Sequence, residues 1–314
     1  MSESVAALDT AAPTGQAGQH VFVVLNPMAG GSSAVDIRAA LARHLGEQSE
    51  LELYETTGED GEDVVALVRS AVERGCQIVL AAGGDGTVSE VAEALVGTSV
   101  PLGIIPVGTA NVFARELGLP LTLDEACGLF AGDHATTTVD AMKVGEQYFV
   151  LQIGVGLDAL MIRDTERSAK RRFGRAAYLW TAATQLVGFQ PQRFTIMADD
   201  VRIRPRASQV LIANGGVLGV PPLTWGPHIQ PNDGKIDVCV VSARTLLDYL
   251  GLIWHTLLGQ QRRDRNVRYL AATRLIVVSA DQPLPVQADG EIIGETPLRI
   301  EVVPRALRVI APRT

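Results

Sequence analysis

The chain has 314 residues, 47% of them hydrophobic and 20% charged, which is typical of a globular protein with about two domains. The net charge of −8 and the pI of about 5.2 exclude a general nucleic-acid binder. The three cysteines, Cys76, Cys127 and Cys239, are widely spaced. They match neither a metal motif nor a disulfide framework and therefore favour a reducing cytoplasm.

The N-terminus lacks the positively charged region and the apolar region of a signal peptide, so we expect no signal peptide there. Residues 1–19 are rich in Ala, Ser, Thr, Gly and Gln, and we expect them to form a disordered tail. No apolar run in the chain approaches the ~20 residues that span a bilayer. We therefore expect no transmembrane segment.

From residue 20 the pattern alternates between strand and helix. Apolar runs predict strands, and stretches with one apolar face predict helices. The predicted strands are 21–25, 51–54, 78–82 and 101–107, and the predicted helices are 34–45, 62–73, 88–95 and 112–117. Such βα alternation indicates a doubly wound parallel sheet that binds ligands at the carboxyl ends of its strands.

Beyond about residue 137, strands follow one another through short turns. Hairpins are predicted around Gly145-Glu146, joining 139–144 to 148–153, and around Asp199-Asp200, joining 193–198 to 201–204. Further strands are predicted at 209–213, 236–241, 274–279, 286–288 and 298–303, and helices at 165–187 and 245–258. This half is therefore predicted to be an antiparallel β-domain with a few helices.

The segment Gly83-Gly84-Asp85-Gly86-Thr87 joins a buried strand to a helix. Glycines let the backbone approach a phosphate, and the N–H groups of a helix N-terminus bind anions. Thr87 and Glu90 also fit a helix capping box, which needs no ligand. Because three glycines and an aspartate exceed what a cap requires, we predict a phosphate-binding loop. The segment matches neither the Walker loop nor the dinucleotide fingerprint.

Two further motifs follow predicted strands. Pro106-Val107-Gly108-Thr109-Ala110-Asn111 precedes a helix and could by itself be an N-cap, and Asn26-Pro27-Met28-Ala29-Gly30 could by itself be a turn. Taken together and in this order, the three motifs resemble the diacylglycerol kinase catalytic-domain family. That family includes soluble bacterial diacylglycerol kinases and the sphingosine and ceramide kinases.

The resemblance continues through the second half of the chain. It includes Val139-Asp140, Gly156-Leu157-Asp158-Ala159, residues 173–178, Asp233-Gly234-Lys235 and Asp289-Gly290-Glu291. It implies a nucleotide-binding α/β domain at 20–138 with an NAD-kinase-like parallel sheet, against which 304–314 packs. It also implies a β-sandwich domain for the lipid substrate at 139–303. The implied activity is ATP-dependent phosphorylation of a lipid hydroxyl.

The resemblance also implies which residues contact ATP. Thr56, after the second predicted strand, could equally be an ordinary loop threonine. The implied contacts are Asn26, Pro27, Met28, Ala29, Gly30, Thr56, Gly83, Gly84, Asp85, Gly86, Thr87, Val88, Ser89, Glu90, Thr109 and Asn111.

Asp289-Gly290-Glu291 fits a simple hairpin turn, but the resemblance implies that this segment supplies the catalytic base. An alcohol is a poor nucleophile until a group within hydrogen-bond reach accepts its proton, and a carboxylate can do so. Glu291 is our first choice for the proton acceptor, with Asp289 as the alternative.

The turn around Asp233 is implied to hold a structural Mg²⁺. Its ligands would be the Asp233 carboxylate and the carbonyl oxygens of Gln230 and Lys235, oxygen donors that suit this hard cation. A plain turn is the alternative. A second Mg²⁺ would arrive with ATP, with Asp85 and Asp140 orienting it through water.

Two positions depart from the family pattern. Val112 stands where the family usually has an aspartate, so one carboxylate of the implied metal network is missing. Gly31 stands where bacterial diacylglycerol kinases often have a lysine. The acceptor could therefore be diacylglycerol or a similar lipid, such as a sphingoid base, a ceramide or a phosphatidylglycerol-like lipid.

Two basic clusters fit adsorption to an anionic membrane, although solvated protein surfaces would look the same. They comprise Arg163, Arg167, Lys170, Arg171, Arg172 and Arg175, and Arg262, Arg263, Arg265 and Arg268. We expect a cytoplasmic protein, peripheral to the inner face of the membrane, and a homodimer is compatible with this interpretation. Two alternative functions remain at this point: an NAD kinase, which shares Gly-Gly-Asp-Gly-Thr, and a non-catalytic nucleotide- or lipid-binding regulator.

Overall fold

A computed structural model of the chain describes residues 18–30, 32–46, 49–59, 61–132, 134–157, 159–160, 191–218, 223–226 and 228–313. The chain divides into two compact units, Met1–Val139 with Arg305–Thr314, and Asp140–Pro304. Several predicted features lie outside the described residues: Gly31, Asp158, the helix at 165–187, the motif at 173–178 and the basic cluster at 163–175.

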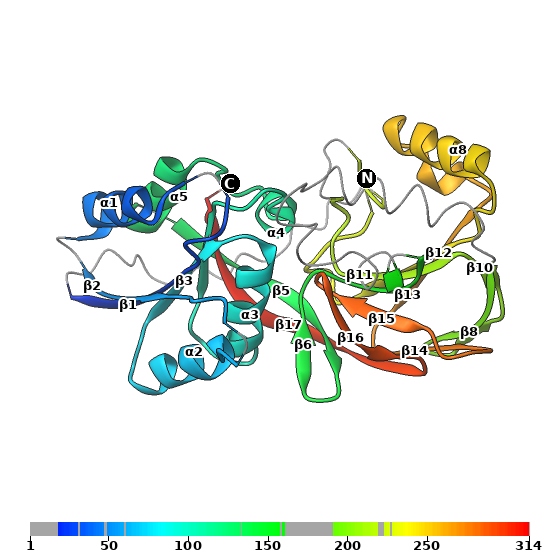
Figure 1. Cartoon of the computed structure of the whole chain (residues 1–314), viewed down its shortest axis with the longest axis horizontal. Helices are drawn as coiled ribbons and strands as arrows, with labels where there is room; N and C mark the ends of the chain where they lie inside the picture. Colours follow the sequence, from blue (N-terminus) through cyan, green and yellow to red (C-terminus); the bar gives the residue numbers. More distant parts are fainter. Residues whose placement is uncertain are drawn as a thin grey trace, which may run out of the picture. The chain divides into compact units, whose positions relative to one another are not determined.

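The first unit is built on a parallel sheet in the order β2-β1-β3-β4, and the last part of β17 adds to β4 through a parallel pair between Val309 and Leu102. Helices α1 and α5 cover one face of this sheet, and α2 and α3 cover the other (Figure 1). The predicted doubly wound α/β fold is confirmed. The elements are β1 (Gln19–Leu25), α1 (Ala34–Leu45), β2 (Ser49–Glu55), α2 (Val64–Glu73), β3 (Ile78–Gly83), α3 (Asp85–Leu95), β4 (Leu102–Pro106), α4 (Val112–Glu116), α5 (Leu123–Ala131) and β17 (Leu298–Pro312).

The apolar runs of this unit form its core. Every residue of β3 is buried, because a parallel strand with helices on both faces has no solvent side. Helix α1 begins at a capping box between Ser33 and Asp36 and buries Ile37 and Leu41 on one face. The loops that follow the strands are thereby held at one edge of a rigid sheet.

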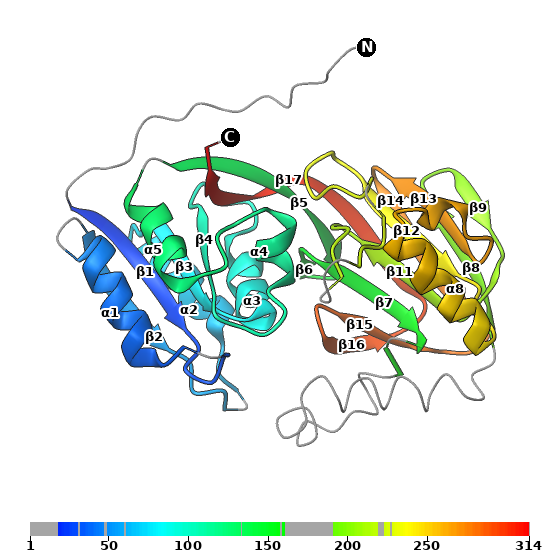
Figure 2. The same ribbon diagram turned by 90° about the horizontal axis from the view of Figure 1, so that it is seen from above.

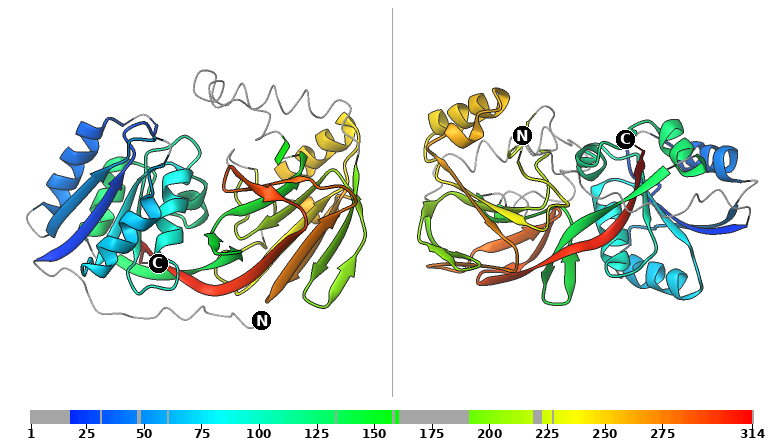
Figure 3. Two further views of the ribbon diagram at one scale, coloured as in Figure 1. Left: turned by 60° about the horizontal axis from the view of Figure 1, so that its bottom comes forward. Right: turned by 180° about the vertical axis from the view of Figure 1, so that it is seen from behind.

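The second unit is an antiparallel β-sandwich, as predicted. One sheet has the order β13-β12-β11-β7-β15-β16, and the other includes β10-β8-β14-β17, with β9 paired to β8. The two sheets pack face to face (Figure 3) around residues such as Ile153, Ile196 and Ile276. The elements are β5 (His134–Val144), β6 (Gln147–Phe149), β7 (Gln152–Gly156), β8 (Gln192–Ala198), β9 (Val201–Ile203), β10 (Arg206–Ala207), β11 (Gln209–Ala213), β12 (Ile236–Val241), α8 (Leu246–Leu257), η1 (Gln261–Arg263), β13 (Val267–Ala272), β14 (Leu275–Ala280), β15 (Pro285–Ala288) and β16 (Glu291–Glu295).

One predicted strand is wrong. The hairpin around Gly145-Glu146 is present, with Val144 opposite Gln147, but 148–153 is not one strand. The chain ends β6 at Phe149 and starts β7 at Gln152, which pairs in the other sheet with β11 and β15. Since residues on both sides of this corner are buried, their apolar character hides the break.

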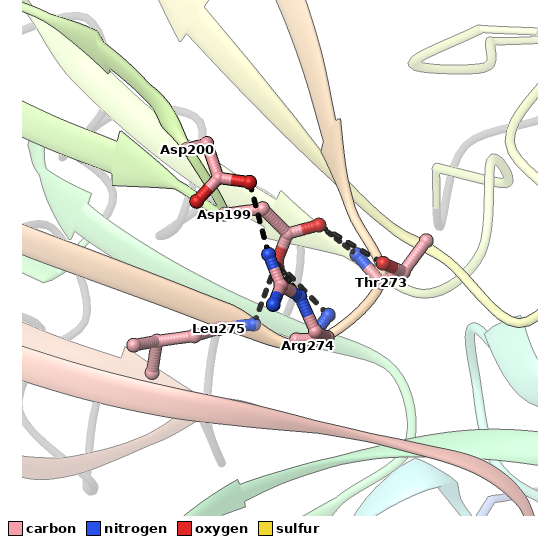
Figure 4. A network of polar contacts seen from close by, with 5 residues as sticks. All are labelled: Asp199, Asp200, Thr273, Arg274 and Leu275. Atoms are coloured by element: carbon pink, nitrogen blue, oxygen red, sulfur yellow. Dashed lines mark hydrogen bonds and ion pairs between the residues drawn. The ribbon is translucent and has the colours of Figure 1, made fainter.

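The hairpin at Asp199-Asp200 is confirmed and carries a polar network (Figure 4). Asp199 accepts hydrogen bonds from the backbone N–H groups of Thr273 (2.8 Å), Arg274 (3.0 Å) and Leu275 (3.0 Å), and from the Thr273 hydroxyl (3.0 Å). Partial burial alone would raise the pKa of Asp199, but these hydrogen bonds outweigh it and lower the pKa to about 2. The carboxylate therefore fixes the turn that leads into β14.

We expect Asp199→Asn to lower the free energy of unfolding at pH 7 by about 1–2 kcal/mol, because the amide cannot accept all of these bonds. A lowered pKa stabilises the fold above pH 4, and this stabilisation is lost as the pH falls towards 2. Urea unfolding at several pH values checks both points. Asp200→Asn is the matched control, since this side chain is 94% exposed; equal losses in the two variants would contradict the prediction.

Candidate active site

Three loops meet at one edge of the first unit. Because β1, β3 and β4 are parallel, the loops after their carboxyl ends share that edge. These loops hold 26–30, 84–87 and 107–111. Thr56 follows β2 at the same edge, where its N–H donates to the Leu25 carbonyl (2.9 Å) and its side chain is buried.

Glycine allows the three loops to pack backbone against backbone. A Cβ added at Gly30, where φ is +64°, would collide with the carbonyl oxygen of Val107. A Cβ added at Gly108 would collide with the Cα of Gly84, whereas one added at Gly86 would meet nothing within 4 Å. The loops after β1 and β3 therefore each depend on the loop after β4, and Gly86 borders open space.

Thr87 lies inside helix α3 and does not cap it. The helix begins at Asp85 with Gly84 as its N-cap and has no side-chain cap, so the capping-box alternative is wrong. The Thr87 hydroxyl accepts a hydrogen bond from Asn26 Nδ2 (3.2 Å), and Asn26 Oδ1 accepts one from the Met28 N–H (2.9 Å). A helix N-terminus that lacks a side-chain cap and is flanked by glycines suits an anion.

Asp85 joins the loop after β3 to helix α4. Its carboxylate accepts a hydrogen bond from the Phe113 N–H (3.2 Å). Asn111 is the N-cap residue of α4, but its side chain does not cap the helix and donates instead to the carbonyls of Pro106 (3.1 Å) and Gly108 (2.9 Å). Burial raises the pKa of Asp85, and the hydrogen bonds from the α4 amides oppose this rise. Thr109, in the same loop, is exposed.

In the second unit, Asp140 holds the turn that was predicted to bind metal. Its side chain is fully buried, and its Oδ2 accepts a hydrogen bond from the Gly234 N–H (2.7 Å). Its own N–H donates to the Pro231 carbonyl (2.7 Å). The turn at 230–235 is thus anchored from both sides by one residue.

The turn at 230–235 offers oxygen atoms of the type that a hard cation uses. Asp233 Oδ1 accepts a hydrogen bond from the Lys235 N–H (3.0 Å), and its Oδ2 lies 3.5 Å from Lys235 Nζ. The backbone bond that anchors this turn to Asp140 uses the Pro231 carbonyl. It does not occupy the carbonyl oxygens of Gln230 and Lys235, which are the predicted metal ligands. Carboxylate and carbonyl oxygens are donor types that Mg²⁺ accepts, and a metal site at this turn stays a prediction. In the described part of the chain, no three His, Cys, Asp or Glu side chains gather as a metal-binding group.

Asp289 and Glu291 lie in the hairpin between β15 and β16 and differ in environment. Asp289 and Gly290 both have positive φ, +46° and +96°, as a two-residue hairpin turn requires. Asp289 Oδ1 accepts a hydrogen bond from the Gln152 N–H (2.9 Å), so this carboxylate is tied to β7. Glu291 begins β16 with an exposed side chain.

Two buried residues of this region were not predicted. Asn214 Nδ2 donates to the carbonyls of Asp140 (2.7 Å) and Val150 (2.8 Å), and Gln287 Oε1 accepts from the Gly290 N–H (3.1 Å). Asn214-Gly215-Gly216 follows a buried strand, a pattern that could have revealed it. Nothing in the local sequence distinguishes Gln287 from a residue of the core.

The comparisons with known proteins agree with this architecture. Residues 20–144 match the model of the diacylglycerol kinase catalytic domain, and residues 152–311 match that of the YegS C-terminal NAD kinase beta sandwich-like domain. The chain belongs to the diacylglycerol kinase family of lipid kinases.

Several relatives span almost the whole chain. A diacylglycerol kinase from Mycobacterium tuberculosis is 29% identical over 93% of this chain and 95% of its own length. A Pseudomonas aeruginosa protein named probable lipid kinase YegS-like is 31% identical over 93% and 94%. The crystal structure of a diacylglycerol kinase from Bacillus anthracis has a TM-score of 0.77 at 24% identity, covering 93% of this chain and 97% of that one; this last similarity concerns the fold alone.

None of the helices in the described part of the chain is both long enough and apolar enough to cross a bilayer.

Proposed function

We propose that the chain is an ATP-dependent kinase that phosphorylates a hydroxyl of diacylglycerol or a similar lipid. The observation that carries this proposal is the contact of three glycine loops beside the N-terminus of α3, which has no side-chain cap. That edge suits a polyphosphate, because backbone N–H groups can approach it closely. Family membership supports the lipid as the acceptor.

The nucleotide would be held by the residues of these loops. In this proposal Gly84, Gly86 and the first-turn N–H groups of α3 contact the phosphates, while Asn26 and Thr87 fix the loop geometry through their hydrogen bond. When bound, ATP would supply the phosphoryl group, and Mg²⁺ would neutralise the charge that develops during its transfer. Gln230, Asp233 and Lys235 would hold a separate, structural Mg²⁺ that keeps the Asp140-anchored turn in place.

Glu291 is proposed as the proton acceptor and Asp289 as a positioning residue. The exposed Glu291 carboxylate can approach a hydroxyl, while the Asp289 carboxylate is held by the Gln152 N–H. Proton acceptance by Glu291 would make the lipid oxygen nucleophilic as the phosphoryl group is transferred.

The function is tested by incubating the full chain with [γ-³²P]ATP, Mg²⁺ and either a total lipid extract or NAD. We expect label only in lipid, with the product identified by mass spectrometry. Label in NAD alone would overturn the proposal in favour of an NAD kinase. ATP binding without labelling of any lipid, unchanged by Glu291→Gln, would identify a non-catalytic regulator.

Asp85→Asn separates the structural and catalytic roles of that carboxylate. The amide oxygen can still accept a hydrogen bond from the Phe113 N–H. A neutral side chain also avoids the unfavourable burial of a charge, which is what raises the pKa of Asp85. A carboxyl whose pKa is raised in the folded state stabilises the fold at low pH. This stabilisation is lost as the pH rises through the pKa of the folded state. We therefore expect the variant to be at least as stable as the wild type at pH 7 in urea unfolding.

We expect the same variant to lose at least about tenfold in kcat, since an amide is a poorer partner for a hydrated cation. Full activity in the stable variant would show that Asp85 acts only as the partner of the α4 amides.

A further inference from the structure

Helix α8 presents an apolar face to solvent. Eleven large apolar side chains are exposed in the part of the chain that the structure describes. Six of these lie on α8 or on its C-cap: Leu247, Leu250, Ile253, Trp254, Leu257 and Leu258. Leu247 is 78% exposed and Trp254 is 62% exposed. Exposed apolar side chains are common singly, but a contiguous group marks a surface that binds a protein, a membrane or a ligand.

The opposite side of α8 accounts for its attachment to the second unit. The helix lies over the outer face of the sheet that contains β11 and β12 (Figures 1 and 2). Thr256 is buried, and His255 Nδ1 lies 2.9 Å from Asp264 Oδ2, which joins the last turn of α8 to the segment after η1. The exposed apolar residues are therefore not needed to hold the helix in place.

Arginines flank the helix. The segment 244–268 contains five of them, Arg244, Arg262, Arg263, Arg265 and Arg268, against two aspartates, although the whole chain carries a net charge of −8. All five arginines are exposed.

Both aspartates of this segment are engaged inside the unit. Asp248 accepts hydrogen bonds from the N–H groups of Arg244 (2.9 Å) and Thr245 (2.8 Å) as part of the capping box. Asp264 is buried and lies against His255. The charge offered to a partner by this segment is therefore positive.

From this combination we infer that α8 and the flanking arginines form a docking surface for an anionic lipid bilayer. The apolar face of a helix lying in the plane of the interface enters the headgroup region, where tryptophan is favoured, while arginines contact anionic headgroups. A protein partner or a second copy of this chain would not specifically require the excess of exposed arginines in this segment. The inference extends the proposed function by naming the surface that would bring the enzyme to its lipid.

The experiment is sedimentation of the full chain with vesicles of phosphatidylcholine and phosphatidylserine in about equal parts, without ATP or acceptor lipid. We expect binding that weakens with added salt and is weaker to pure phosphatidylcholine. Leu250→Gln with Trp254→Ala should reduce the partition coefficient at least about tenfold, and Arg262→Glu with Arg263→Glu should reduce binding to anionic vesicles only. Val35→Gln, which alters an exposed valine (74%) of the first unit, is the matched control and should bind like the wild type.

Trp254 also provides a direct signal. Brominated lipids should quench the tryptophan fluorescence of the wild type, and Trp254→Phe should lose most of this quenching while still binding. The inference is overturned if the wild type ignores anionic vesicles or if the Leu250/Trp254 variant binds them equally well. It is also overturned if sedimentation velocity shows a dimer that this variant abolishes while vesicle binding is unchanged.

The vesicle assay and the kinase assay can fail independently. Binding is measured without the reactants, so an inactive kinase that binds vesicles contradicts only the proposed function. The Leu250/Trp254 variant should keep wild-type turnover of a short-chain, water-soluble diacylglycerol. An active kinase that never binds vesicles contradicts only the docking surface.

Discussion

Replacing Glu291 with glutamine is expected to lower kcat for lipid phosphorylation by about 10²–10⁴-fold, the usual contribution of a positioned general base. Glutamine keeps the size of the side chain but cannot accept the hydroxyl proton. The side chain is exposed, so the free energy of unfolding should not change. Initial rates at saturating ATP and lipid, together with urea unfolding, check both expectations.

Two changes at Asp289 decide which carboxylate is the base. Asp289→Asn keeps an oxygen that can accept the hydrogen bond from the Gln152 N–H, whereas Asp289→Ala removes it. If Asp289 only positions the turn, the asparagine variant stays within a few-fold of wild type and the alanine variant loses activity and about 1 kcal/mol of stability. An asparagine variant as inactive as Glu291→Gln would show that Asp289 takes part in proton transfer.

Gly30→Ala is expected to be the most damaging single-methyl change in the first unit. The backbone at Gly30 has φ +64°, and the new Cβ would collide with the Val107 carbonyl. The left-handed conformation and the displaced backbone together should lower the free energy of unfolding by about 3 kcal/mol. Because the loops after β1 and β4 must separate, ATP affinity should fall at least about tenfold, as titration calorimetry would measure.

Gly118→Ala is the matched control for this collision. Gly118 has nearly the same conformation, φ +63°, but a Cβ there would meet nothing within 4 Å. It should lose only the ~1 kcal/mol of the left-handed backbone and bind ATP like the wild type. Equal effects in the two variants would show that the contact between Gly30 and Val107 is unimportant.

The fold was predictable where one local signal was enough. Buried strands such as β3 are uninterrupted apolar runs, and Gly30 and Gly108, which belong to two of the predicted loop motifs, stand where the backbone packs against other backbone. Helix α5 was not predicted because Gly128 interrupts its short helical pattern of apolar residues. Strand β13 was not predicted because apolar and polar residues alternate only weakly along it and because its arginine was assigned to a basic cluster.

Contacts between distant parts of the chain were not predictable in the same way. Asp85 reaches an amide 28 residues away, and Asn214 reaches a carbonyl 74 residues away; neither contact leaves a local periodicity. Helix α8 was predicted, but a helix that is apolar on most of its surface is normally buried. Its exposed face is visible only once the neighbouring elements are placed.

Strand β17 has a consequence for the order of events during synthesis. Val309 pairs with Leu102, the Gly97 N–H donates to the Ala306 carbonyl (2.8 Å), and Ile310 belongs to the core that α1 and α5 cover. The parallel sheet that positions the glycine loops therefore lacks a strand while the ribosome is still making the β-sandwich. Since such long-range pairing forms slowly, the nascent chain would carry an open β4 edge, available to chaperones, until β17 emerges.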